Sequence, residues 1–179
     1  MSDLKIRCVI GIDPGKNGGL AIYLRDTNEI KVIKMPKEDT ELIGFFRYYC
    51  ENFDAICFLE KLSIRHDDLV SSGKVYHIQK MLANYEHLKA MLEVSEMPYV
   101  MVHPLSWQSR LRLRIKGEEK TARKRRYAEI AKAMYPAVKV TLWNADALMI
   151  LTFGRYILAN DLKWLRTNLP SKELSKLLF

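Results

Sequence analysis

Cysteine is scarce in this chain, and the histidines do not occur at the spacings typical of metal ligands. The 179 residues include three cysteines, Cys8, Cys50 and Cys57, and no two of them form a Cys-x-x-Cys pair. The four histidines are also too scattered to form a metal-spaced cluster. Zinc sites are usually built from such pairs, so the sequence argues against a zinc protein. Because Cys8 and Cys57 stand within apolar runs, we expect both to be buried thiols.

Long apolar runs are absent too. No stretch approaches the roughly 20 apolar residues that a membrane span needs, and the N-terminal residues lack the apolar core of a signal peptide. We therefore expect the protein to stay in the cytoplasm, or in the host cytoplasm if it is viral. No repeat, low-complexity segment or linker divides the chain. Its length suits one domain, with a core over 1–160 and a helical appendage of the same domain over 161–179.

Positive charge is what the chain has in excess. The net charge is +8 and the pI about 9.4, and nine of the 18 residues from 109 to 126 are Lys or Arg. Such a concentration predicts a polyanionic partner, most often nucleic acid, bound in a salt-dependent way. A merely basic protein without such a partner is the alternative.

Hydrophobic patterning indicates an α/β chain. Short apolar or alternating runs predict strands over 8–12, 20–24, 29–35, 55–59 and 99–102, and one further short strand over 138–141. Helices are predicted over 40–52 and 75–92, near Trp107, over 122–135 after a Thr121 cap, and beyond an Asn144 cap. The helix over 75–92 is either core or, on one face, a dimer seam. A three-strand meander followed by alternating elements predicts a mixed sheet with helices on both faces.

Three carboxylates stand where elements end or begin. Asp13 and Glu60 each follow a buried strand, and Asp146 lies in the first turn of the last long helix. Neighbouring parallel strands lie about 5 Å apart, so we expect Asp13 and Glu60 side by side, with Asp146 packed over them. Three carboxylates so close repel one another, and a divalent cation bound by oxygen ligands relieves the repulsion. Two such ions about 4 Å apart can hydrolyse a phosphodiester.

Each acid also has a purely structural interpretation. Asp13 can cap the turn that follows it, and Glu60 can pair with Lys61 or Arg65. Asp146 can stabilise the N-terminus of its helix by about 0.3–1 kcal/mol. These alternatives stay open for each residue alone, whereas three acids at three such positions beside a basic segment favour a metal site.

Four short segments give this pattern a family resemblance. They are Gly11–Gly15 (Gly-Ile-Asp-Pro-Gly), Leu59–Glu60, Glu119–Thr121 and Ala145–Leu148. In their order and rough spacing, over about residues 6 to 158, the chain resembles the RuvC family of Holliday junction resolvases, of phage or bacterial type, within the RNase H-like superfamily. The resemblance implies an α/β, RNase H-like mixed five-stranded sheet, a three-strand antiparallel meander plus parallel strands, flanked by helices.

The resemblance also implies a function and its residues. The protein would be a homodimeric, metal-dependent endodeoxyribonuclease that resolves branched DNA by paired phosphodiester hydrolysis, without a nucleotide cofactor. Asp13, Glu60 and Asp146 would hold Mg²⁺ or Mn²⁺, two ions per site. Lys120 would lie near the scissile phosphate, its alternative being one solvated lysine among many. The further candidates for DNA contacts are Lys16, Lys74, Arg110, Arg112, Arg114, Lys116, Arg123 and Lys124.

Two positions depart from the family pattern. Trp143 stands three residues before Asp146, where family members carry an acid or His, and Asn144 offers an oxygen only at another offset. Ser63 stands where bacterial members can place an aromatic wedge. Trp143 motivates a second hypothesis, a catalytically weakened junction-binding protein of the same fold. A small-molecule phosphotransferase shares the Gly-Ile-Asp-x-Gly turn, but 179 residues cannot supply its two lobes.

Overall fold

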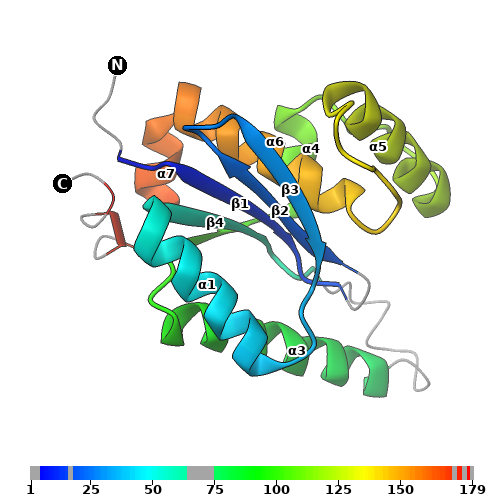
Figure 1. The fold of residues 1–179 in the computed structure, drawn as a ribbon. Helices are drawn as coiled ribbons and strands as arrows, with labels where there is room; N and C mark the ends of the chain where they lie inside the picture. The colour runs from blue at the N-terminus through cyan, green and yellow to red at the C-terminus, as the bar shows by residue number, and fades with distance from the viewer. Residues whose placement is uncertain (1–4, 16–17, 64–74, 171–172, 175–176, 178–179) are drawn as a thin grey trace.

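The centre of the fold is a five-stranded sheet in the order β3-β2-β1-β4-β5 (Figure 1). The computed structural model describes residues 5–15, 18–63, 75–170, 173–174 and 177. The strands are β1 (Cys8–Asp13), β2 (Gly19–Leu24), β3 (Glu29–Lys34), β4 (Ala55–Glu60) and β5 (Tyr99–Val102). The first three pair antiparallel, whereas β1 with β4 and β4 with β5 pair parallel. The predicted mixed sheet, a meander joined to parallel strands, is confirmed.

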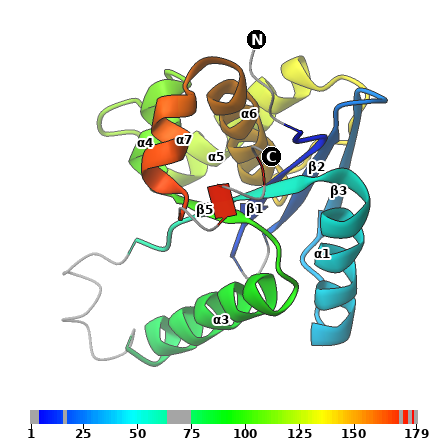
Figure 2. The same ribbon diagram turned by 90° about the vertical axis from the view of Figure 1, so that its left-hand side faces the viewer.

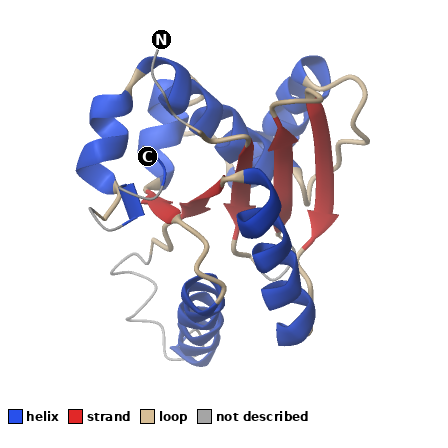
Figure 3. Cartoon of the chain, turned by 60° about the vertical axis from the view of Figure 1, so that its left-hand side comes forward, coloured by secondary structure: helices blue, strands red, loops and turns tan. Residues whose placement is uncertain are grey.

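Helices cover both faces of this sheet. They are α1 (Asp39–Phe53), α3 (Val75–Val94), α4 (Pro104–Arg110), α5 (Lys120–Met134), α6 (Ala145–Asn160) and α7 (Leu162–Asn168). Figures 1 and 2 show α1 and α3 on one face and the other four on the opposite face, and Figure 3 shows the strands between the two helical layers. Within the described ranges, no helix is both long and apolar enough to cross a bilayer.

Strand β1 is buried on both faces and separates two hydrophobic clusters. Cys8, Ile10 and Ile12 pack toward α1 and α3, whereas Val9 packs toward α6. Cys8 and Cys57 are fully buried, as the sequence predicts. A side chain at Gly11 would strike the backbone of Ala147 and Leu151. Because glycine has no side chain, α6 packs directly on β1, and its first turn reaches the carboxyl end of that strand.

The predicted strand over 138–141 does not form. These residues belong to a loop before α6, and the Asn144 amide takes the backbone groups that a neighbouring strand would bind. Its Oδ1 accepts from the Thr141 N–H at 2.8 Å and its Nδ2 donates to the Lys139 carbonyl at 3.1 Å. Asn144 does stand at the N-cap position of α6, but its side chain makes no capping bond.

The predicted Thr121 cap is also wrong. Helix α5 begins at Lys120, two residues earlier than predicted, with Glu119 at the N-cap position and no side-chain cap. The sequence offers Thr as the better capping residue, but the chain is already helical when it reaches Thr121. Capping preference is about 1 kcal/mol, which the packing of an amphipathic helix can override.

The last helix is tied to the core. The Asp161 carboxylate caps α7 by accepting from the Trp164 N–H at 3.1 Å. Leu165 and Leu169 are buried with the α6 residues, and the Trp164 ring meets the Phe153 ring edge-on at 5.3 Å between centroids. Trp164 therefore packs against the core.

Candidate active site

The three predicted carboxylates are brought to one end of the sheet. Asp13 is the last residue of β1 and Glu60 the last residue of β4. These strands run parallel with Ile12 opposite Leu59, so the two acids leave neighbouring strand ends at the same level. Asp146 lies in the first turn of α6, directly before the residue whose backbone rests on Gly11.

Glu60 is the most perturbed of the three acids. Burial raises its pKa to about 8, and the negative charges of Asp13 and Asp146 add to the rise. The Trp107 indole opposes it by donating its Nε1–H to Glu60 Oε1 at 2.9 Å. Trp107 is itself buried beneath Tyr127, so it packs and also orients Glu60. A hydrogen bond to the charged form favours ionisation.

Asp13 is the charge neighbour that links the other two. Burial raises the pKa of Asp146, and the charge of Asp13 is its next cause. The pKa of Asp13 is likewise raised by burial, against the Gly15 N–H and the charge of Lys124. A like charge raises the pKa of a carboxyl group only at short range. The charge of Asp13 therefore reaches both Glu60 and Asp146.

The turn after β1 keeps Asp13 in place. Its Oδ1 accepts from the Gly15 N–H at 3.0 Å, which is the turn-capping bond considered as its structural alternative. A side chain at Gly18 would strike the Asp13 backbone, so the close turn needs glycine there. Only one Asp13 oxygen is used in this bond. The turn role and a ligand role are thus compatible.

Lys124 is the cation beside these acids. Its Nζ lies 3.6 Å from Asp146 Oδ2, and its charge lowers the pKa of all three carboxyls. Lys120 is exposed one turn earlier on α5 and is not among the charges that shift them. The sequence does indicate that Lys120 and Lys124 lie on the same face of α5, because residues four apart share a helix face. However, only a structure shows which turn of α5 passes the carboxylates.

Comparison of the sequence with protein-family models finds no match, and comparison with curated protein sequences finds none either. Solved structures do match. RuvC of T. thermophilus in complex with a Holliday junction substrate aligns with a TM-score of 0.51 at 16% identity, covering 86% of this chain and 96% of that one. The chain has a RuvC-like fold. This confirms the fold that the motifs indicate.

Two more solved structures are similar at lower scores. A second structure of Thermus thermophilus RuvC aligns with a TM-score of 0.49 at 15% identity, covering 85% of this chain and 95% of that one. The yeast mitochondrial Holliday junction resolvase Ydc2 aligns with a TM-score of 0.46 at 15% identity, covering 93% of this chain and 84% of that one.

Trp143 fills space beside the carboxylates of this RuvC-like fold. Its ring lies so close to Gly19 that a Cβ there would come within 2.6 Å of it, and Gly19 pairs directly with Asp13 in the sheet. Asn144 does not take the place of a fourth acid, because both ends of its amide are bonded within the 139–144 loop. We therefore do not retain Asn144 as a ligand.

The remaining cations fall into separate groups. Arg114, Lys116, Lys120 and Arg123 line a cavity of about 560 Å³ between α4 and α5. Lys124 lies at the carboxylates instead. Arg110 forms an ion pair with Asp161 at 2.7 Å, and Arg112 is an exposed loop residue with a positive φ of 56°. Lys16 and Lys74 lie outside the described residues, as does Arg65.

The carboxylates suit hard cations by their chemistry. All the donors are oxygens, which Mg²⁺ and Mn²⁺ prefer, and Asp146 Oδ1 is buried without a hydrogen-bond partner. Among the described residues, no three or more His, Cys, Asp or Glu side chains are arranged to hold a single ion. The donor chemistry of Asp13, Glu60 and Asp146 thus fits a hard divalent cation.

Proposed function

We propose that this protein is a Mg²⁺- or Mn²⁺-dependent endodeoxyribonuclease that resolves four-way DNA junctions and related branched DNA. The observation that carries the proposal is the electrostatic convergence of Asp13, Glu60 and Asp146 at the end of β1 and β4 in a RuvC-like fold. T. thermophilus RuvC is known in complex with a Holliday junction substrate. The cavity between α4 and α5, lined by four cations and by Glu118 and Glu119, adds a surface of net positive charge for DNA phosphates.

The residues of the site have separable tasks in this proposal. Asp13, Glu60 and Asp146 would hold the metal ions. Once bound, Mg²⁺ or Mn²⁺ supplies an activated water and stabilises the leaving oxygen of the phosphodiester. Trp107 fixes the orientation of Glu60 through its N–H. Lys124 contributes positive charge beside the reacting phosphate, where negative charge builds up in the transition state.

Two active sites are needed to cut opposite strands of a junction, so the proposal includes a homodimer. Helix α3 supports it. Val75, Tyr76, Met81 and Leu82 are large apolar residues in the first half of α3, and they are 37–68% exposed. Apolar residues gathered on one element are typical of a surface that a second copy covers.

A synthetic four-way junction tests the activity directly. We expect paired nicks in the junction when Mg²⁺ is present, and no cutting when EDTA replaces Mg²⁺. Asp13→Asn should retain junction binding in a gel-shift assay and lose cleavage by at least about 100-fold, because a metal ligand is lost. Asp26→Asn is the matched control, since Asp26 is an exposed acid paired with Arg7. Cleavage by Asp13→Asn at the wild-type rate would refute the assignment.

Trp143 supports a second candidate, a junction-binding protein of the same fold whose catalysis is weakened. It stands at the sequence position where the family resemblance implies another ligand, and its ring lies against Gly19, which pairs with Asp13. A Mg²⁺ and Mn²⁺ titration of junction cleavage separates the two candidates. Tight, selective junction binding with no cleavage at any metal concentration would favour the weakened protein.

A further inference from the structure

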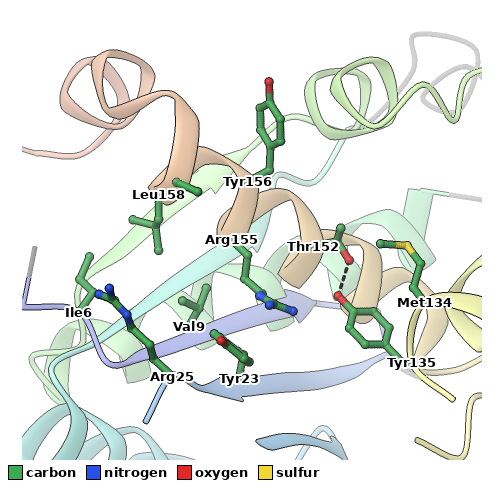
Figure 4. A pocket seen from close by; sticks show the side chains of 11 residues that line it. Ile6, Val9, Tyr23, Arg25, Met134, Tyr135, Thr152, Arg155, Tyr156 and Leu158 are labelled. Carbon is green, nitrogen blue, oxygen red and sulfur yellow. Dashed lines mark hydrogen bonds between the residues drawn. The ribbon is translucent and has the colours of Figure 1, made fainter. Parts of the chain in front are cut away.

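A second site lies at the end of the sheet opposite the carboxylates. A cavity of about 730 Å³ opens between the start of β1, the end of β2 and the second half of α6 (Figure 4). Arg155 on its wall stands nine residues beyond Asp146, which is about 13 Å along the helix axis. The volume is within the range of small-molecule sites, about 300–1,000 Å³. Nothing in the proposed nuclease chemistry uses this cavity.

The cavity carries positive charge that no acid neutralises. Arg25 and Arg155 line it, and no Asp or Glu is among the described residues that do so. The Arg155 guanidinium lies over the Tyr23 ring, 3.8 Å from the centroid (Figure 4). Stacking on a ring face fixes the guanidinium and leaves its in-plane N–H groups available. In the described part of the chain, neither guanidinium has a carboxylate or hydrogen-bond partner. The cavity is therefore built for an anion.

The wall formed by Thr152 and Tyr135 offers acceptors rather than donors. Thr152 Oγ1 gives its only proton to the Leu148 carbonyl at 2.8 Å. The Tyr135 hydroxyl, 2.6 Å from Thr152 Oγ1, must therefore donate to it (Figure 4). Both O–H protons are used inside the protein, and lone pairs remain on the two oxygens. A ligand that reaches this wall must bring its own N–H or O–H donor.

The body of the ligand is indicated by the rest of the lining. Tyr23 and Tyr135 supply aromatic surface, and Val9 and Ile6 supply aliphatic surface. The Tyr156 side chain points away from these residues (Figure 4). Aromatic and aliphatic surface of this kind favours a flat, apolar ring.

We propose that this cavity binds a nucleoside monophosphate whose base carries an exocyclic amino group. Arg155 and Arg25 bind the phosphate, the base lies against Tyr23 and Tyr135, and the amino group donates to Tyr135 or Thr152. Such a ligand combines an anion, a flat ring and an N–H donor, which match the guanidiniums, the aromatic surface and the hydroxyl oxygens of the lining. The inference does not depend on the nuclease proposal, because it uses none of the carboxylates.

Isothermal titration of the full-length protein with AMP tests the site. We expect AMP to bind, adenosine and inorganic phosphate to bind at least tenfold more weakly, and UMP, which lacks the amino group, to bind several-fold more weakly. Arg155→Gln should lower AMP affinity at least tenfold, and Arg25→Gln should lower it to a lesser degree because Arg25 is exposed. Arg166→Gln on α7 is the matched control and should leave AMP affinity unchanged. Thermal denaturation of each variant checks folding.

Two results would overturn the site: adenosine binding as tightly as AMP, or AMP affinity unchanged in both arginine variants. No AMP binding at millimolar concentration would also overturn it. The nucleotide can be free or the phosphorylated end of a DNA strand, and competition separates these sources. Displacement of AMP from Asp13→Asn by a 5′-phosphorylated dinucleotide, but not by its unphosphorylated form, assigns the site to a strand end. Absence of displacement assigns it to the free nucleotide.

Discussion

At the scale of single residues, the candidate site depends on acids that oppose folding when they are charged. Glu60 holds its proton up to about pH 8 in the folded chain, against an ordinary value of 4.5. Between these pH values the folded state binds more protons than the unfolded state, so a rise in pH lowers the free energy of unfolding. A bound divalent cation would remove this cost by stabilising the ionised form.

The Glu60→Gln variant tests how the charge of Glu60 affects the stability of the folded protein. The variant keeps an oxygen for the Trp107 N–H and carries no charge, so it should lose less stability than the wild type as the pH rises from 5 to 8. In EDTA, we expect its Tm relative to wild type to be higher at pH 8 than at pH 5 by about 3 °C or more. Thermal denaturation at both pH values measures this. An equal difference at both would show that Glu60 does not titrate in this range.

Lys120 and Lys124 of α5 allow a second test on single residues. Lys124 contacts Asp146 and Lys120 does not, although Lys120 is the residue that the family resemblance selects. Lys124→Ala should lower junction cleavage by about 100-fold, and Lys120→Ala should lower only junction affinity, several-fold. Single-turnover cleavage with saturating enzyme separates rate from binding. The reverse ranking would return the catalytic role to Lys120.

At the scale of elements, the contact of α6 with β1 decides whether the acids meet. Gly11→Ala would place a methyl group on the backbone of Ala147 and Leu151, where neither partner can rotate away. We expect a loss of about 3 kcal/mol, or about 6–12 °C in Tm. Gly44→Ala in α1 is the control, because its Cβ meets nothing within 4 Å. It should stabilise the helix by about 0.5–1 kcal/mol. Equal changes in Tm for Gly11→Ala and Gly44→Ala would contradict the close packing of α6 on β1.

This contact also explains what the sequence can predict. Apolar runs at Cys8–Ile12 and 55–59 mark buried strands wherever they occur, and the acids at their ends follow from parallel pairing. The approach of α6 is set by a glycine in the middle of β1, and sequence patterning alone does not reveal it. The 138–141 loop fails as a strand because Asn144, a tertiary partner, takes its hydrogen bonds. Likewise, the choice between Lys120 and Lys124 is made by the position of α5 on α6.

At the scale of the whole molecule, α3 extends beyond the layer that it helps to build. Figure 2 shows it projecting from the sheet while α1 covers the neighbouring strands. Ile78, Tyr85, Leu88 and Leu92 are its buried residues. Met81 and Leu82, in its first half, are 40% and 38% exposed. This copy of the chain thus leaves part of the apolar stripe of α3 open.

A charge on that open stripe should separate the two copies of the proposed dimer. Burying a charged group in an apolar contact is costly unless it is paired, so Leu82→Glu should shift the protein from dimer to monomer in analytical ultracentrifugation at micromolar concentration. Asn84→Glu adds the same charge at an exposed polar position of α3 and should leave the mass unchanged. The monomer should still nick a junction, because the carboxylates of one site come from one chain. However, the two nicks should become independent events, and linear duplex products should appear only after singly nicked junctions accumulate. If the wild-type protein is already monomeric at these concentrations, α3 is not a dimer interface, and any paired cleavage must depend on another surface.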